Sequence, residues 1–151
     1  MTNRSGTDGT ILLRTAAVLW FVWGLVHIFA GVMTMLMDTP LAVQGIADAV
    51  DPALLDTTYP AAAGAMINQH GFNLFWRGCV TTACSFCVWR GSANAIFLAA
   101  LTGGLADIGY FVFLDIGGFV NFVPGTVMTI FSATAIVMSF FVYFKIMRSG
   151  G

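Results

Sequence analysis

Three ionisable side chains, His27, Arg77 and Asp107, lie deep inside long apolar stretches of the chain. Hydrocarbon cannot solvate such groups, and a charge at the centre of a membrane-spanning helix costs at least ~2.5–3.5 kcal/mol on insertion scales. They are therefore expected to pair with one another or to line a polar cavity. Arg77 and Asp107 carry opposite charges and predict an ion pair, while His27 can hold or release a proton near neutral pH. These three are the predicted catalytic residues.

The composition predicts the environment of these residues. The 151-residue chain is 58% hydrophobic and only 9% charged, whereas soluble domains carry about 25% charged residues. This balance indicates an integral membrane protein with membrane lipids as its neighbours. A net charge of −1 predicts that nucleic acid is not a partner.

Four hydrophobic stretches each approach the ~20 residues that a helix needs to cross a bilayer. They cover residues 15–37, 69–89, 93–114 and 122–144. We therefore predict an all-α fold: an integral membrane four-helix bundle, with residues 1–151 forming a single transmembrane domain. One long external loop, 38–60, joins the first two helices, and residues 41–50 within it are predicted to form a short helix over the bundle mouth.

The distribution of basic residues predicts the orientation. Lys and Arg flank the outer ends of the first and last helices and the turn between the second and third, at Arg4, Arg14, Arg90, Lys145 and Arg148. The 38–60 loop carries only acidic charges, at Asp38, Asp48, Asp51 and Asp56. Because basic residues concentrate on the cytoplasmic side, both termini are predicted to be cytoplasmic, in a bacterial-type inner membrane.

Residue spacing places the polar side chains at one depth. His27 lies 13 residues beyond Arg14, and Arg77 lies 13 residues before Arg90, so both are about 20 Å from these inner markers. Helical spacing also gives each crossing one polar or small face. The predicted ligand-binding residues are His70, Asn73, Trp76, Trp23, Tyr110, Thr129 and Ser132. In the alternative interpretation, the Arg77–Asp107 pair only fixes helix packing and His27 bonds Ser132 or Thr129.

The histidines and cysteines of the chain bear on which cofactors it could bind. Two histidines on neighbouring crossings are compatible with haem, but His70 is predicted to lie about 10 Å nearer the outer surface than His27. A closed metal site needs more ligands than two histidines supply. Cys84 and Cys87 have the CxxC spacing of membrane thiol oxidoreductases and in this are similar to the vitamin K epoxide reductase family. The chain has no second cysteine pair to pass electrons on, so packing is the favoured role.

Three classes of function follow from a buried polar pocket open to the external side. The favoured one is binding of a lipophilic small molecule, such as a quinone, lipid or isoprenoid, by a subunit of a larger membrane complex or by a homo-oligomer. The second is an enzyme performing proton-transfer chemistry on a lipophilic substrate, with His27 and Asp107 as acid and base. The third is a small proton-coupled transporter.

Overall fold

The computed structural model describes residues 4–147, and it describes side chains over residues 9–145. Arg148 and the side chain of Arg4, both used to predict the orientation, lie outside the described part. Within that part the chain is all-helical. The α-helices are α1 (Arg4–Leu36), α2 (Thr39–Ile46), α3 (Pro52–Leu55), α4 (Ala61–Trp89), α5 (Ala93–Ala99), α6 (Leu105–Tyr110) and α7 (Val127–Val142). Wider π-helical segments continue them, at η1 (Ala100–Gly104), η2 (Phe111–Asp115), η3 (Phe122–Thr126) and η4 (Tyr143–Met147).

Three helical segments are long and apolar enough to cross a membrane: Gly9–Leu36, Ala93–Asp115 and Phe122–Lys145. They coincide with the predicted crossings over 15–37, 93–114 and 122–144, and they fit a membrane protein. The predicted crossing over 69–89 lies within α4, which is 29 residues long but does not belong to this apolar set. Its polar residues lower its hydropathy; they are Asn68, Gln69, His70, Asn73 and Arg77.

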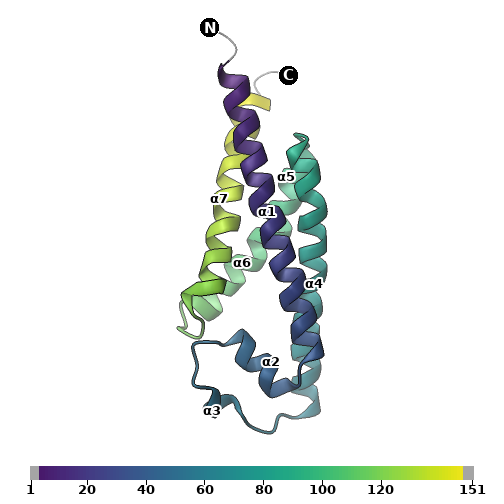
Figure 1. Cartoon of the computed structure of the whole chain (residues 1–151), viewed down its shortest axis with the longest axis vertical. Coiled ribbons are helices and arrows are strands. Elements are labelled where there is room, and N and C mark those ends of the chain that lie inside the picture. The colour runs from purple at the N-terminus through teal and green to yellow at the C-terminus, as the bar shows by residue number, and fades with distance from the viewer. Residues whose placement is uncertain (1–3, 148–151) are drawn as a thin grey trace.

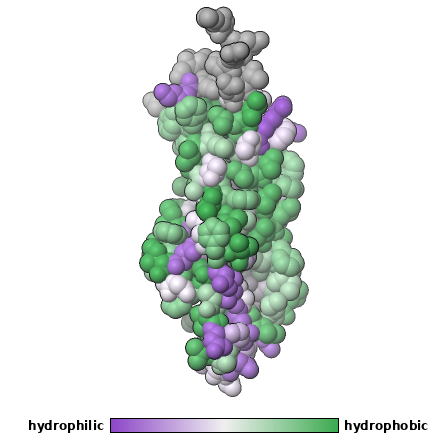
Figure 2. Space-filling model, turned by 60° about the vertical axis from the view of Figure 1, so that its left-hand side comes forward, coloured by the Kyte–Doolittle hydropathy of each residue, from purple (hydrophilic) through white to green (hydrophobic). Residues whose placement is uncertain are grey.

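The long helices lie along one axis of the molecule (Figure 1). The ends of α1 and α7 nearest the two termini are at the top of this view, while α2 and α3 close the bottom. Figure 2 shows a mostly hydrophobic surface, with hydrophilic residues in the lower half of the face shown and again near its upper end. Large apolar side chains such as Phe29, Leu105 and Val137 are more than 60% exposed, as expected where lipid surrounds the helices.

Glycines set the distance between α1 and α4, which make the most extensive helix contact in the described chain. A Cβ on Gly78 would approach Gly24 O to 2.6 Å and Ile28 N to 2.7 Å. A Cβ on Gly31 would likewise meet the backbone of Gly71 and Phe75. The glycines are seven residues apart in both helices, so they meet as two antiparallel pairs two turns apart. This close packing of small residues is typical of helix contacts within membranes.

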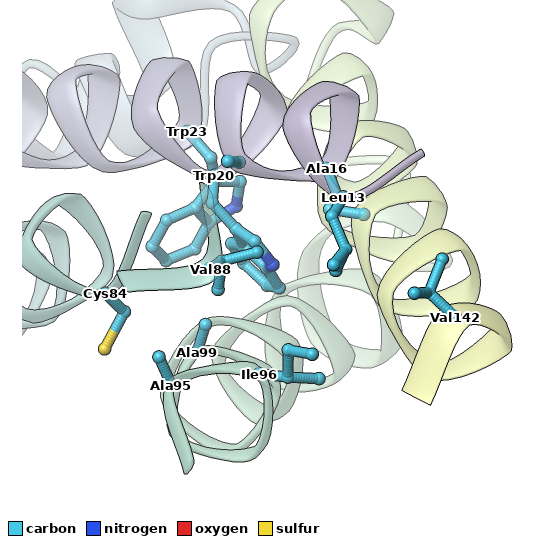
Figure 3. Packing of buried hydrophobic residues seen from close by; sticks show 12 residues of the cluster. Leu13, Ala16, Trp20, Trp23, Cys84, Val88, Ala95, Ile96, Ala99 and Val142 are labelled. Atoms are coloured by element: carbon cyan, nitrogen blue, oxygen red, sulfur yellow. The ribbon is translucent and has the colours of Figure 1, made fainter. Parts of the chain in front are cut away.

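The hydrophobic core of the protein gathers buried side chains from α1, α4, α5 and α7 (Figure 3). Trp20 and Trp23 of α1 are fully buried and meet edge to face, with ring centroids 5.9 Å apart. They pack against residues of the other long helices, among them Val88, Ile96, Ala99, Ala135 and Val142. Gly103 makes room for Trp20, because a Cβ there would clash with the indole ring. The core therefore ends at Trp23, and the polar groups begin next to it.

Candidate functional site

A cavity of about 350 Å³ lies beyond this core, between the long helices and α2. Five of the predicted site residues line it together: His27 of α1, His70 and Arg77 of α4, and Asp107 and Tyr110 of α6. The remaining wall is mainly apolar and includes Val26, Ala30, Leu74, Ala106, Phe113, Leu114 and Met128. The volume is at the lower end of the range found for small-molecule sites.

Asp107 lies at the base of the cavity and is 5% exposed. Its Oδ2 accepts a hydrogen bond from the indole Nε1–H of Trp23 at 2.8 Å, and the side chain of Ser132, whose hydroxyl donates to Thr129 O, lies nearby. The short helix α6 that carries Asp107 lies between the π-helical segments η1 and η2. Such segments are rare and often occur at functional sites.

The predicted ion pair between Arg77 and Asp107 does not form. Within the described side chains, no nitrogen of Arg77 lies within 4.0 Å of a carboxylate oxygen. The guanidinium instead lies over the ring of Trp76, 5.6 Å from its centroid. The physical reason is that the neutral indole of Trp23 already donates to Asp107, while Arg77 finds an aromatic face on its own helix. Both residues still border the same cavity.

His27 is held from two directions. Its ring stacks on Trp23, with centroids 3.5 Å apart and planes 17° from parallel, and its Nδ1 is 2.8 Å from Trp23 O. A carbonyl oxygen can only accept, so Nδ1 carries the proton and donates it. The Nε2 atom of the neutral ring is then an acceptor and is the ring nitrogen left for the cavity. The alternative interpretation paired His27 with Ser132 or Thr129, but the hydrogen bond that His27 makes is to the backbone of its own helix.

Five of the predicted ligand-binding residues do not line this cavity: Asn73, Trp76, Trp23, Thr129 and Ser132. Asn73 accepts a hydrogen bond from Trp76 Nε1 at 3.1 Å, on the outer side of α4. Thr129 and Ser132 border a second, almost wholly apolar groove between the Ala93–Asp115 helix and α7, which Asp107 also reaches. Trp23 is buried and acts on the cavity only through Asp107 and His27.

The external segment contributes residues that the sequence did not single out. Gly45, Ile46 and Asp48, at the end of α2, line the cavity. Asp48 Oδ1 accepts from the backbone N–H of Asn121 at 2.6 Å, and Asp48 O accepts from Asn121 Nδ2 at 2.8 Å. Asp48 therefore fastens α2 to the turn before η3. Residue 48 falls within the 41–50 helix predicted over the bundle mouth, and that position was the available signal.

The candidate cofactor ligands are dispersed. In the described side chains, no group of three or more His, Cys, Asp or Glu is placed to hold a metal ion. Cys79, Cys84 and Cys87 are free thiols. The two histidines border one cavity, although counting from the cytoplasmic anchors placed them at different depths.

Comparison with known protein families, curated proteins and solved structures finds no match to this chain. Its function is therefore inferred from the geometry of the cavity. The relevant facts are the ionisable groups on its wall, the mainly apolar remainder of that wall, and the helix α2 across one side.

Proposed function

We propose that this chain is a four-helix integral membrane protein whose cavity binds a small or amphipathic ligand, as a subunit of a membrane complex. The ligand class is a quinone, lipid or isoprenoid. The observation that carries this proposal is the gathering of His27, His70, Arg77 and Asp107 around one cavity with otherwise largely apolar walls. Ionisable groups within a membrane protein are costly, and they are typically retained for function. Apolar walls with a few convergent polar groups are typical of small-molecule sites.

The positions of the basic residues support the proposed orientation, with both termini in the cytoplasm. The guanidinium of Arg14 lies 5.1 Å from the ring centroid of Trp89, which places it beside Arg90 at the turn after α4. The end of α7 that leads to Lys145 is at the same end of the molecule (Figure 1). The Asp-rich segment with α2 and α3 is at the opposite end. In this arrangement α4 also crosses the membrane and is the second of four crossings along the chain. Its residues Arg77 and His70 border the cavity.

A second candidate function is proton-transfer catalysis on a lipophilic substrate. The observation that favours it is the contact of one residue, Trp23, with both His27 and Asp107. Nε2 of neutral His27 would take a proton from a bound substrate, and Asp107 would serve as the second acid–base group. Transport is the third candidate, because Asp107 borders both the polar cavity and the apolar groove.

The proposal is tested by identifying what leaves the membrane with the protein. Native mass spectrometry of the detergent-purified chain, followed by analysis of the extracted lipids, should show one enriched lipophilic compound. Gly109 lines the cavity, and a Cβ there would meet nothing within 4 Å, so Gly109→Leu should fill the cavity and lose the compound. Ala83→Leu, on the exposed face of α4, should retain it. Equal retention by both variants would rule out this cavity as the site.

A further inference from the structure

The polar groups of the cavity differ in whether the protein supplies their partners. Asp107 accepts from Trp23, Asp48 accepts from Asn121, and His27 Nδ1 donates to a backbone carbonyl. Arg77 has no such partner within the described side chains, where its one direct contact of this kind is the ring of Trp76. Each carboxylate of the cavity wall is thus provided with a donor, and the one permanent cation lacks an acceptor.

This imbalance indicates which chemical groups a ligand would need in order to pair with Arg77. A guanidinium has five N–H donors, no acceptor, and a charge that persists in proteins. A stacked ring attracts the charge but takes up none of the in-plane N–H donors. Arg77 is half-buried, so bulk water satisfies it only in part, and unmade hydrogen bonds of charged groups are costly. An oxygen-rich anion fits this gap best, since carboxylates and phosphates accept two parallel N–H bonds from arginine.

The neighbouring side chains are compatible with such a head group. His70 and Tyr110 line the same cavity, and both side chains can donate a hydrogen bond. Asp48 is the nearer carboxylate to solvent, being exposed at the end of α2, and Asp107 is occupied by Trp23. Neither carboxylate is a partner of Arg77, so an anion bound in the cavity would supply the acceptors that its guanidinium lacks.

The wall also indicates where the rest of the ligand lies. Phe113 lines the cavity and is 75% exposed on the outer surface. An apolar edge of the cavity is therefore continuous with the lipid-facing surface of η2. A cavity of about 350 Å³ holds a head group and the first part of a chain, and the remainder can leave past Phe113 into the acyl region.

We infer that the ligand is an amphiphile with a single anionic head group, bound by Arg77, and an apolar chain that leaves the cavity beside Phe113. This inference rests on the proposed ligand-binding function and narrows its ligand class. Neutral quinones and sterol-like molecules, which lack the anion, should bind less tightly than an anionic amphiphile of equal chain length.

A head-group series with one chain length tests the inference. Dodecanoate, dodecyl phosphate and dodecanol are titrated into the detergent-purified protein, with binding followed by isothermal calorimetry. We expect at least one anion to bind roughly 10–100-fold more tightly than the alcohol, the range set by a charge-assisted hydrogen bond. The tighter of the two anions identifies the head group as carboxylate or phosphate. Equal affinity for the alcohol and both anions would overturn the inference while leaving the proposed function intact, and no binding by any of the three would count against both.

Two variants assign the preference to Arg77. Arg77→Gln should abolish the preference for the anion with little change in affinity for dodecanol, and Arg77→Lys should keep part of it because the charge remains. Arg90→Gln, which removes a cation at the C-terminal end of α4, away from the cavity, should behave like the wild type. An unchanged preference in Arg77→Gln would overturn the inference. If Arg77→Gln does not fold, the head-group preference of the wild type and its reduction in Arg77→Lys still test the inference.

Discussion

The indole N–H of Trp23 donates to Asp107 Oδ2 across 2.8 Å and so joins α1 to α6. This hydrogen bond lies at the boundary between the hydrophobic core and the cavity. The same indole ring stacks on His27. One buried aromatic side chain thus fixes the positions of the two groups best suited to proton transfer.

Trp23→Phe should destabilise the protein more than Trp20→Phe. Both indoles are fully buried, but Trp20 Nε1 has no hydrogen-bond partner among the described residues, whereas Trp23 Nε1 serves Asp107. The difference should be about 1–3 kcal/mol, the cost of a buried polar group deprived of its partner. Thermal or chemical unfolding in detergent measures it, and equal losses would show that the Trp23–Asp107 bond contributes nothing.

Asp107→Asn should have a small effect on stability, within about 1 kcal/mol, because an amide oxygen can still accept from Trp23. Asp107→Leu should cost more, since it leaves the indole N–H unpaired. The exposed loop residue Asp56 provides the control, as Asp56→Asn should change nothing. A loss of about 3–5 kcal/mol in Asp107→Asn is the behaviour of a broken buried ion pair, and it would contradict the hydrogen-bond partners assigned here.

Gly78→Ala should weaken the α1–α4 contact, because the new methyl group would lie 2.6 Å from Gly24 O. Backbone cannot rotate away as a side chain can, so we expect a loss of about 1–3 kcal/mol. Gly109→Ala, whose Cβ meets nothing within 4 Å, should be neutral or stabilising by up to about 1 kcal/mol. Melting temperatures of the two variants would decide, and identical values would argue against close backbone packing.

Asn121→Ala should loosen the attachment of α2 to the turn before η3, because it removes the side-chain bond to Asp48 O while the backbone bonds from Asn121 N to Asp48 Oδ1 and from Ala49 N to Phe119 O remain. Hydrogen–deuterium exchange over residues 39–50 should then become faster, and ligand exchange should accelerate with it. Asn68→Ala, at an exposed site on α4, is the matched control. Unaltered exchange in Asn121→Ala would mean that α2 is held by its packing and not by this contact.

Cysteine labelling tests the orientation. In a background with Cys79, Cys84 and Cys87 replaced by alanine, Thr57→Cys in the acidic segment should react with a membrane-impermeant maleimide in intact cells. Asn94→Cys, at the exposed start of α5, should react only after the membrane is permeabilised. The reverse pattern would invert the proposed topology.

Periodicity and hydropathy were sufficient to predict the helices. The crossings predicted over 93–114 and 122–144 coincide with the apolar segments Ala93–Asp115 and Phe122–Lys145, because twenty apolar residues in a row have few alternatives to a helix. Helical spacing also assigned Asp107 and Tyr110 to one face, and both line the cavity. The start of α4 at Ala61 was missed, although residues 61–67 are apolar and rich in alanine, the strongest helix former.

Partners of individual polar atoms could not be predicted in this way. Opposite charges suggested Arg77 for Asp107, but the choice depends on which neutral donors are nearer, and Trp23 looks like an ordinary core residue in sequence. The pairing of Gly24 with Gly78 and Gly31 with Gly71 had a signal, the equal spacing of seven residues in both stretches. Only the antiparallel register of α1 and α4 makes that spacing meaningful.

The glycine pairs have a consequence for how the cavity can vary in size. The backbones of α1 and α4 touch at both glycine pairs, Gly24 with Gly78 and Gly31 with Gly71. The two helices cannot slide or separate without losing both contacts, so they form a rigid wall of the cavity. The opposing wall runs through η1, α6 and η2, where the hydrogen-bonding pattern already departs from the regular α-helix. Bulkier ligands must therefore be accommodated by a shift of that wider-coiled helix. The wall that carries Arg77 keeps its position, so it limits the size of ligand that fits without this shift.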